Sequence, residues 1–208
     1  VMLARVRYDL YSESNVGFLV TNREFLDGHS RLAGLDGSLR IGRTHQVSFF
    51  ALGTNHRDLE GVDRKGHMVE ANIRRQGRNL SYFLAHYQIS PDFRADTGFI
   101  RRVDYKNTTA NMSYRWWPES WIINWGPRVN YRLNHDFDDV KQDEQMGMSM
   151  DVRFAKSIDV NASVNRDMER FHGIDFWKTR YTFTGDVRTS RRISIGAHVD
   201  VGDQIYFE

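Results

Sequence analysis

The clearest pattern in the chain is W-I-I-N-W-G-P-R-V-N-Y-R-L at residues 121–133. Its odd positions are apolar or aromatic from Trp121 to Leu133, and its even positions are Asn, Gly or Arg, with Ile122 the exception. A period of two is typical of a β-strand with one apolar and one polar face, because a helical period of 3.6 would mix the two sets. At roughly 3.3 Å per residue the strand spans about 43 Å, enough to cross an apolar band about 25 Å tall even when tilted. The pattern predicts a strand of a transmembrane β-barrel.

The same alternation recurs along the chain and predicts about twelve strands. They are residues 1–11, 16–25, 35–41, 45–55, 69–74, 83–89, 110–116, 121–133, 146–154, 158–165, 177–187 and 193–201. The predicted tight turns are residues 12–14, 42–44, 76–79, 118–120, 155–157 and 189–192, and the predicted longer loops are 26–30, 55–66, 90–104, 135–144 and 169–173. Alternating short and long connections are found in outer-membrane barrels. We expect an all-β, antiparallel up-and-down transmembrane barrel in the bacterial outer membrane, with residues 1–208 as one domain.

Composition narrows the class of protein. The 208 residues are 40% hydrophobic with a mean hydropathy of -0.61, and no apolar run approaches the roughly 20 residues that a spanning helix needs. The 29 basic and 27 acidic residues nearly cancel, which argues against a nucleic-acid binder. The absence of cysteine excludes disulfides and thiol nucleophiles. No cofactor is expected, and membrane lipid is the first expected partner.

A soluble antiparallel barrel or sandwich is the main alternative fold, since its strands also alternate. The strand length, the alternation of connections and the presence of only three prolines favour the membrane barrel. Aromatic residues also gather near predicted strand ends, where interfacial girdles lie. The two groups are Trp116, Trp117 and Trp121 beside a short turn, and Phe171, Phe176 and Trp177 beside a longer loop.

Residues 89–105 carry a family resemblance and read I-S-P-D-F-R-A-D-T-G-F-I-R-R-V-D-Y. They resemble a signature of bacterial outer-membrane barrels that are classified as a domain of unknown function. The matching residues are Pro91, Asp92, Phe93, Gly98, Phe99, Arg102 and Asp104, and the segments Ser14–Phe18 and Tyr114–Pro118 fit the same pattern. In that family the barrel usually follows a domain resembling a family 9 carbohydrate-binding module, which this sequence lacks. The resemblance implies a glycan or another envelope component as a partner, and it implies no catalytic residues.

If the apolar face meets lipid, the charged side chains line the lumen. The predicted lumen-lining residues are Arg5, Arg7, Arg40, Arg74, Arg115, Arg128, Arg132, Asp151, Arg153, Asp159, Arg180, Asp186 and Asp200. The predicted lipid-facing residues are Trp121, Trp125, Val129, Met148, Val160, Tyr181 and Ile195.

Two functions are compatible with this lining. A lumen of mixed sign could select an anionic or sugar-like solute, which makes the chain a non-enzymatic, porin-like barrel that binds or passes that solute. Alternatively, the charges pair across strands and fill a closed barrel, which then has a structural or docking role with a plugged lumen.

Enzymatic and metal sites have weaker signals. The loop 135–144 offers Asp136, Asp138 and Asp139 as oxygen ligands for calcium, but it lacks the glycine and spacing of a standard calcium loop, so a solvated acidic loop is the simpler interpretation. His45, His56 and His67 are too far apart in sequence to indicate a shared site. Serine, histidine and aspartate are all present without a G-x-S-x-G elbow, so an outer-membrane hydrolase stays an alternative and an enzyme is not expected.

The direction of the strands also predicts that the native protein is longer. If the short turns are periplasmic, Val1 and Glu208 both lie on the extracellular side, whereas single-chain bacterial barrels ordinarily keep both termini in the periplasm. A closed twelve-stranded barrel is allowed geometrically, because the first and last strands would pair antiparallel. We instead expect a segment of a larger barrel, with further strands before Val1 and after Glu208.

Overall fold

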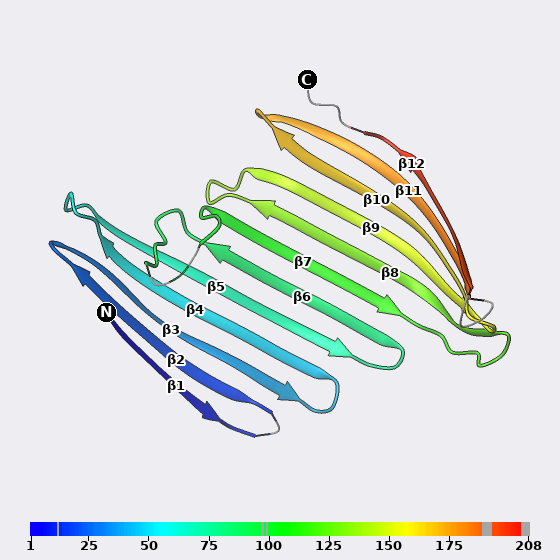
Figure 1. Cartoon of the computed structure of the whole chain (residues 1–208), viewed down its shortest axis with the longest axis horizontal. Helices are drawn as coiled ribbons and strands as arrows, with labels where there is room; N and C mark the ends of the chain where they lie inside the picture. The colour runs from blue at the N-terminus through cyan, green and yellow to red at the C-terminus, as the bar shows by residue number, and fades with distance from the viewer. Residues whose placement is uncertain (12, 97, 99, 189–192, 205–208) are drawn as a thin grey trace. The chain divides into compact units, whose positions relative to one another are not determined.

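The computed structural model describes residues 1–11, 13–96, 98, 100–188 and 193–204, and the described residues form twelve β-strands and no helix (Figure 1). The strands are β1 Met2–Asp9, β2 Asn15–Phe25, β3 Gly28–Ile41, β4 His45–Arg57, β5 Asp63–Gln76, β6 Leu80–Ile89, β7 Tyr105–Tyr114, β8 Ile122–His135, β9 Lys141–Phe154, β10 Ile158–Phe171, β11 Ile174–Arg188 and β12 Ser194–Gly202. Each strand is hydrogen-bonded to the strands before and after it in the chain, so the order of strands in the sheet is the order in the chain. The prediction of an all-β, up-and-down architecture of about twelve strands is confirmed.

The sheet is open in the described part of the chain. Its order begins with β1 and ends with β12, and neither of these strands has a second neighbour there. An open sheet is consistent with a segment of a larger barrel. No described helix has the length and apolarity to span a membrane.

The predicted alternation of short and long connections is wrong. Residues 26–30 and 169–173 were expected to be loops, but β2 and β3 are joined by residues 26–27, and β10 and β11 by residues 172–173. Polar residues such as His29 and Glu169 stay in the ladder, paired with Glu24 and Asp143, because backbone hydrogen bonds do not require apolar side chains. Loops 55–66 and 135–144 shrink to 58–62 and 136–140 for the same reason. Of the five predicted longer loops, only residues 90–104 keep their predicted length. Phe99 of the predicted signature and the predicted turn 189–192 lie outside the described residues.

The first compact unit comprises residues 1–74, 84–108 and 134–140. Within it, the register of β1 to β4 aligns Val6, Phe18, Leu35 and Ala51 in one row across the strands. The next row aligns Arg7, Gly17, Asp36 and Phe50. Because neighbouring rows point to opposite sides of a sheet, this unit has an apolar face with the first row and a polar face with the second.

The connection 90–104 lies against the polar face of the first unit, across β4 and β5 (Figure 1). Phe93 of this connection is buried together with Leu32 of β3 and Ile89 of β6, and Leu52 and Tyr87 pack against these three. The apolar side of β6, which carries Tyr87 and Ile89, therefore faces the connection. From alternation alone, Tyr87 and Ile89 would be expected on the apolar face of the sheet. They lie on the polar face instead, because Phe93 of the connection gives them an apolar surface to pack against.

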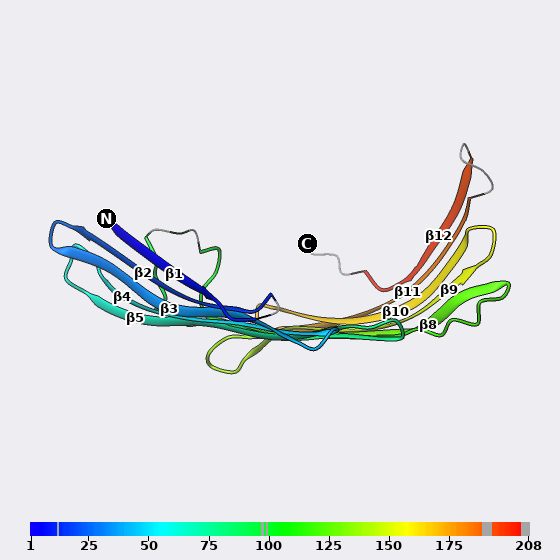
Figure 2. The ribbon, with the colours of Figure 1, turned by 90° about the horizontal axis from the view of Figure 1, so that it is seen from below.

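The second compact unit comprises residues 75–83, 109–133 and 141–208. One row of its register aligns Met148, Val164, Tyr181 and Val201, and another aligns Arg153, Asp159, Asp186 and Gly196. This unit therefore also has an apolar and a polar face. Figure 2 shows β10, β11 and β12 bending together along their length.

Candidate functional site

The candidate site is the polar face, which carries the predicted lumen-lining residues. Register or alternation places Arg5, Arg7, Arg40 and Arg74 on the polar face of the first unit, and Arg128, Arg132, Asp151, Arg153, Asp159, Arg180, Asp186 and Asp200 on that of the second. Arg115 directly follows β7 and lies beside this second group. The two groups belong to different units, so the structure gathers the predicted set into two clusters.

Many of these charges are paired across strands. Arg5 contacts Asp36 at 2.9 Å and Arg153 contacts Asp159 at 2.6 Å. Arg128 lies 3.6 Å from Asp151, and Arg40 pairs with Glu13. Arg153–Asp159 and Arg128–Asp151 join neighbouring strands, where opposite charges stabilise a sheet modestly, whereas Arg5 reaches across β2 to Asp36 of β3. Each pair leaves fewer free charges on this face.

The predicted lipid-facing residues share the opposite side of the second unit. Val160, Met148, Tyr181 and Ile195 lie on the apolar face by register, and Trp121, Trp125 and Val129 occupy the odd positions around β8. The ring of Trp121 stacks on Phe154 of β9 at 5.4 Å between centroids, which joins the two groups into one surface. Most of these side chains are exposed, for example Trp121 at 70% and Tyr181 at 59%, whereas Trp125 and Val160 are partly buried.

Aromatic side chains mark both ends of the strands in the second unit. Near the connection 115–121, Trp116 stacks on Trp125 with centroids 4.4 Å apart, and Trp121 lies on Phe154. Toward the opposite strand ends, the guanidinium of Arg166 lies 4.5 Å from the ring centre of Trp177. Cation–π contacts and ring stacking fix the orientation of such rings. The sequence predicted aromatic groups at these positions.

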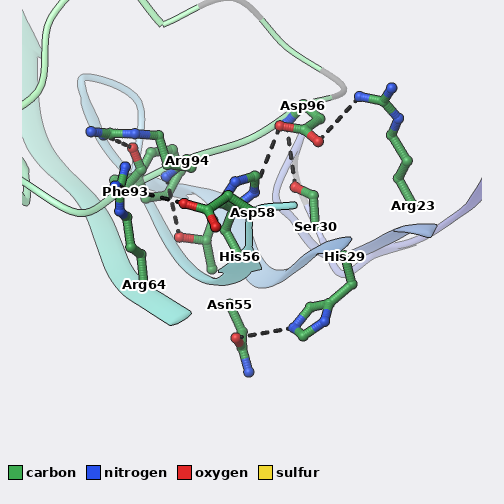
Figure 3. Close-up of polar contacts among 11 residues, drawn as sticks. Arg23, His29, Ser30, Asn55, His56, Asp58, Arg64, Phe93, Arg94 and Asp96 are labelled. Atoms are coloured by element: carbon green, nitrogen blue, oxygen red, sulfur yellow. Dashed lines mark hydrogen bonds and ion pairs between the residues drawn. The ribbon is translucent and has the colours of Figure 1, made fainter. Parts of the chain in front are cut away.

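The connection 90–104 is anchored to the polar face of the first unit by polar contacts (Figure 3). Asp96 is the centre of these contacts. Its carboxylate lies 3.1 Å from Arg23 of β2 and 3.7 Å from Nδ1 of His56 of β4, and its backbone N–H donates to the Ser30 hydroxyl of β3 at 3.4 Å. The backbone N–H of Arg94 reaches the Thr54 hydroxyl at 3.5 Å. The connection is thus tied to three neighbouring strands.

Gly66 allows the backbone of the connection to approach β5. A Cβ atom at Gly66 would lie 2.3 Å from Cα of Phe93, closer than any real Cβ contact, so no larger residue fits without moving the connection. Phe93 beside it is 1% exposed. Sequence reasoning identified the segment by its resemblance, but it did not find Gly66 or the anchors Arg23, Ser30 and Thr54, whose roles depend on pairing between distant strands.

Ser30, His56 and Asp96 bring together the three residue types of a hydrolase triad. Ser30 and His56 are direct partners in the β3–β4 register. No hydrogen bond joins their side chains in the described part of the chain, Nδ1 of His56 lacks a hydrogen-bond partner, and Ser30 is 5% exposed with its hydroxyl accepting the N–H of Asp96. Acyl transfer needs a nucleophile in contact with its base. In this geometry the three residues anchor the connection.

A hollow of about 240 Å³ indents the polar face of the second unit. Six of the predicted lumen-lining residues line it: Arg115, Arg128, Asp151, Arg153, Asp159 and Asp186. The sequence did not single out Asn124, which lies among them on β8. Alternation marked Asn124 only as one of several polar residues, and nothing local distinguishes it from Asn130.

Two carboxylates of the acidic turn 136–140 have structural roles. Asp136 accepts the backbone N–H of Val140 at 2.8 Å, and Asp139 pairs with Lys106 at 2.6 Å. The hydrogen bond from Lys106 lowers the pKa of the Asp139 carboxyl. Across the described residues no group of three or more His, Cys, Asp or Glu side chains is placed to hold a metal ion, so Asp136, Asp138 and Asp139 do not form such a group.

Fold and site together define an all-β protein with an open antiparallel up-and-down sheet, in which each of the two compact units has one polar face and one apolar face. The chain belongs to a family described as a domain of unknown function (DUF5916), which matches residues 14–203. No curated protein and no solved structure matches it significantly.

Proposed function

We propose that the chain forms part of a β-barrel in the bacterial outer membrane, that its apolar face contacts lipid, and that its polar face lines a lumen that binds or passes a solute. The observation that carries this proposal is the separation of exposed apolar side chains from charged ones within each unit. Met148 and Tyr181 are 54% and 59% exposed and lie in one row, with Arg153, Asp159 and Asp186 on the other side. An apolar surface of this extent is unfavourable in water and favourable in hydrocarbon.

Two further features support the location. The stacked rings of Trp116 and Trp125, and Trp177 toward the other strand ends, fit the interfacial positions of a membrane barrel. The resemblance of residues 89–105 to outer-membrane barrels that follow a carbohydrate-binding-like domain supports the same compartment and an envelope partner. Membrane lipid is then the partner of the apolar face.

A plugged barrel with a structural or docking role is the second candidate, because the connection 90–104 lies on the polar face of the first unit. A connection held by Arg23, Ser30 and Thr54 would narrow a lumen on that face. This barrel would insert into membrane without conducting.

Detergent phase partitioning followed by planar-bilayer recording tests both candidates. The proposal predicts that the purified protein enters the detergent phase and gives discrete conductance steps. Insertion without conductance would favour the plugged barrel. Recovery of a folded, monomeric protein in the aqueous phase would contradict both candidates and favour a soluble barrel.

A further inference from the structure

The hollow in the second unit combines charges of both signs in equal number. Arg115, Arg128 and Arg153 line it together with Asp151, Asp159 and Asp186. A bound anion would be close to three carboxylates, and a bound cation would be close to three guanidinium groups, so neither sign gains a net attraction. The balance favours a solute without net charge.

Two of the arginines are already committed to neighbouring carboxylates. Arg153 contacts Asp159 at 2.6 Å, and Arg128 lies 3.6 Å from Asp151, which also accepts a hydrogen bond from Asn161 at 2.8 Å. In the described part of the chain, Arg115 has no carboxylate partner and Asp186 has no hydrogen-bond or ion-pair partner. The hollow therefore offers one guanidinium donor and one carboxylate acceptor on a framework that the paired residues fix in place.

Asn124 supplies an independent indication of a ligand. It lines the hollow, is 6% exposed, and its side-chain amide has no hydrogen-bond partner among the residues that the structure describes. Its amide atoms are not among the described side-chain atoms that are both shut off from water and without a partner, so they face the open space of the hollow. A hydrogen-bonding solute in the hollow can take the place of water at both the donor and the acceptor of this amide.

We infer that this hollow binds an uncharged, hydroxyl-rich solute, a sugar or a linear polyol. A hydroxyl group both donates and accepts hydrogen bonds, so neighbouring hydroxyls can donate to the Asp186 carboxylate and accept from Arg115 while Asn124 does both. Charge-assisted hydrogen bonds of this kind are stronger than neutral ones. The inference rests on the proposed function, in which this face lines the lumen, and it selects the sugar-like solute over the anionic one.

Saturation-transfer NMR and equilibrium dialysis on the full chain in detergent micelles test the inference. The probes are glucose, maltotriose and sorbitol, with inorganic phosphate, putrescine and diglycine as anionic, cationic and zwitterionic comparators. We expect saturable binding of at least one uncharged probe and no saturable binding of the comparators. Binding of diglycine or of a charged comparator in preference to the uncharged probes would overturn the inference, as would no binding of any uncharged probe.

Three variants locate the site. Arg115→Gln and Asn124→Leu remove hydrogen-bonding groups from the hollow, whereas Arg170→Gln changes a charge that pairs with Asp175 near the end of β10, outside the hollow. We expect at least about tenfold weaker sugar binding for the first two and unchanged binding for the third, since each lost bond to a charged or buried group weakens binding by about that factor. Circular dichroism verifies folding, and Arg115→Gln remains informative if Asn124→Leu does not fold. Sugar binding that survives in folded Arg115→Gln would overturn the assignment.

The outcome separates this inference from the proposed function. A protein that enters the detergent phase and conducts, but binds no sugar, retains the proposed function and loses the inference. A protein that binds sugar through Arg115 yet stays in the aqueous phase loses the proposed function, and the hollow is then a site on a soluble barrel.

Discussion

At the scale of single residues, Arg128 and Val129 are adjacent in β8 and lie on opposite faces. We predict that Val129→Arg lowers the free energy of unfolding in lipid vesicles by roughly 2–4 kcal/mol, the cost of arginine on a lipid-facing position near the midplane. Arg128→Val should cost less, because it removes one member of a half-exposed pair with Asp151. Urea titration of both variants in the same vesicles provides the measurement. If Arg128→Val is the more damaging change, the two faces are assigned the wrong way round.

Asp139 gives a pH-dependent prediction at the same scale. Its hydrogen bond with Lys106 lowers the pKa of the carboxyl below the ordinary 3.8, so the folded state favours the ionised form. The stabilisation is fully present above pH 3.8 and is lost as the pH falls through the lower pKa of the folded state. Asp139→Asn should therefore be slightly less stable than the native chain at pH 6, with the difference disappearing below that lower pKa. A difference that grows toward low pH would contradict this account.

At the scale of elements, the connection 90–104 depends on the absence of a side chain at Gly66. Gly66→Val should displace Phe93, because its Cβ would meet the backbone there at 2.3 Å. We expect trypsin to cleave at Arg94, Arg101 or Arg102 at least about tenfold faster, since local opening exposes the backbone to the protease. In a conducting barrel the same variant should raise the single-channel conductance.

Gly53→Ala is the matched control for Gly66→Val. Gly53 lies in β4, and a Cβ there would come no closer than 4.0 Å to the carbonyl oxygen of Ala33, an ordinary contact. Cleavage and conductance should match the native protein. Equal protection of the connection in the two variants would show that the contact between Gly66 and Phe93 does not hold it in place.

The elements also show what the sequence could predict. Alternation found the number of strands, the two sides of β8 and the long connection at 90–104, because a period of two follows directly from the pleat of a strand. The strands predicted for β3 and β10 are too short, because residues such as His29 and Glu169 resemble loop residues but pair through their backbones. It also could not foresee that Tyr87 and Ile89 face the connection, because their apolar partner Phe93 belongs to a segment without periodicity.

The candidate site was predictable in its residue types and not in its contacts. The charged side chains on the polar face follow from alternation, and the structure groups six of them around one hollow. Asn124 and the anchors of Asp96 depend on which strands are neighbours and on their register. Register fixes which residues meet, and the pattern within a single strand does not determine it.

At the scale of the whole molecule, the outer edges of β1 and β12 have no strand neighbour in the described sheet. Unpaired backbone N–H and C=O groups are very costly in hydrocarbon, so both edges must be covered in a membrane. We predict slow amide hydrogen exchange throughout β1 in vesicles, comparable to exchange in β3. Exchange in β1 as fast as in the turn 136–140 would show that its edge is in water, and the sheet would then not be a barrel wall.

The orientation of β8 in a membrane is the most direct test of the two-faced sheet. The chain contains no cysteine, so single cysteines at residues 121–134 can each carry one spin label in vesicles. We predict a period of two in label accessibility, with contact to membrane-dissolved oxygen highest at Trp121, Ile123, Trp125 and Val129. Contact with a water-soluble nickel reagent should be highest at Asn124, Arg128 and Arg132. The inverse pattern, or nickel contact at every position, would contradict the proposal that the apolar face of this sheet lies in lipid.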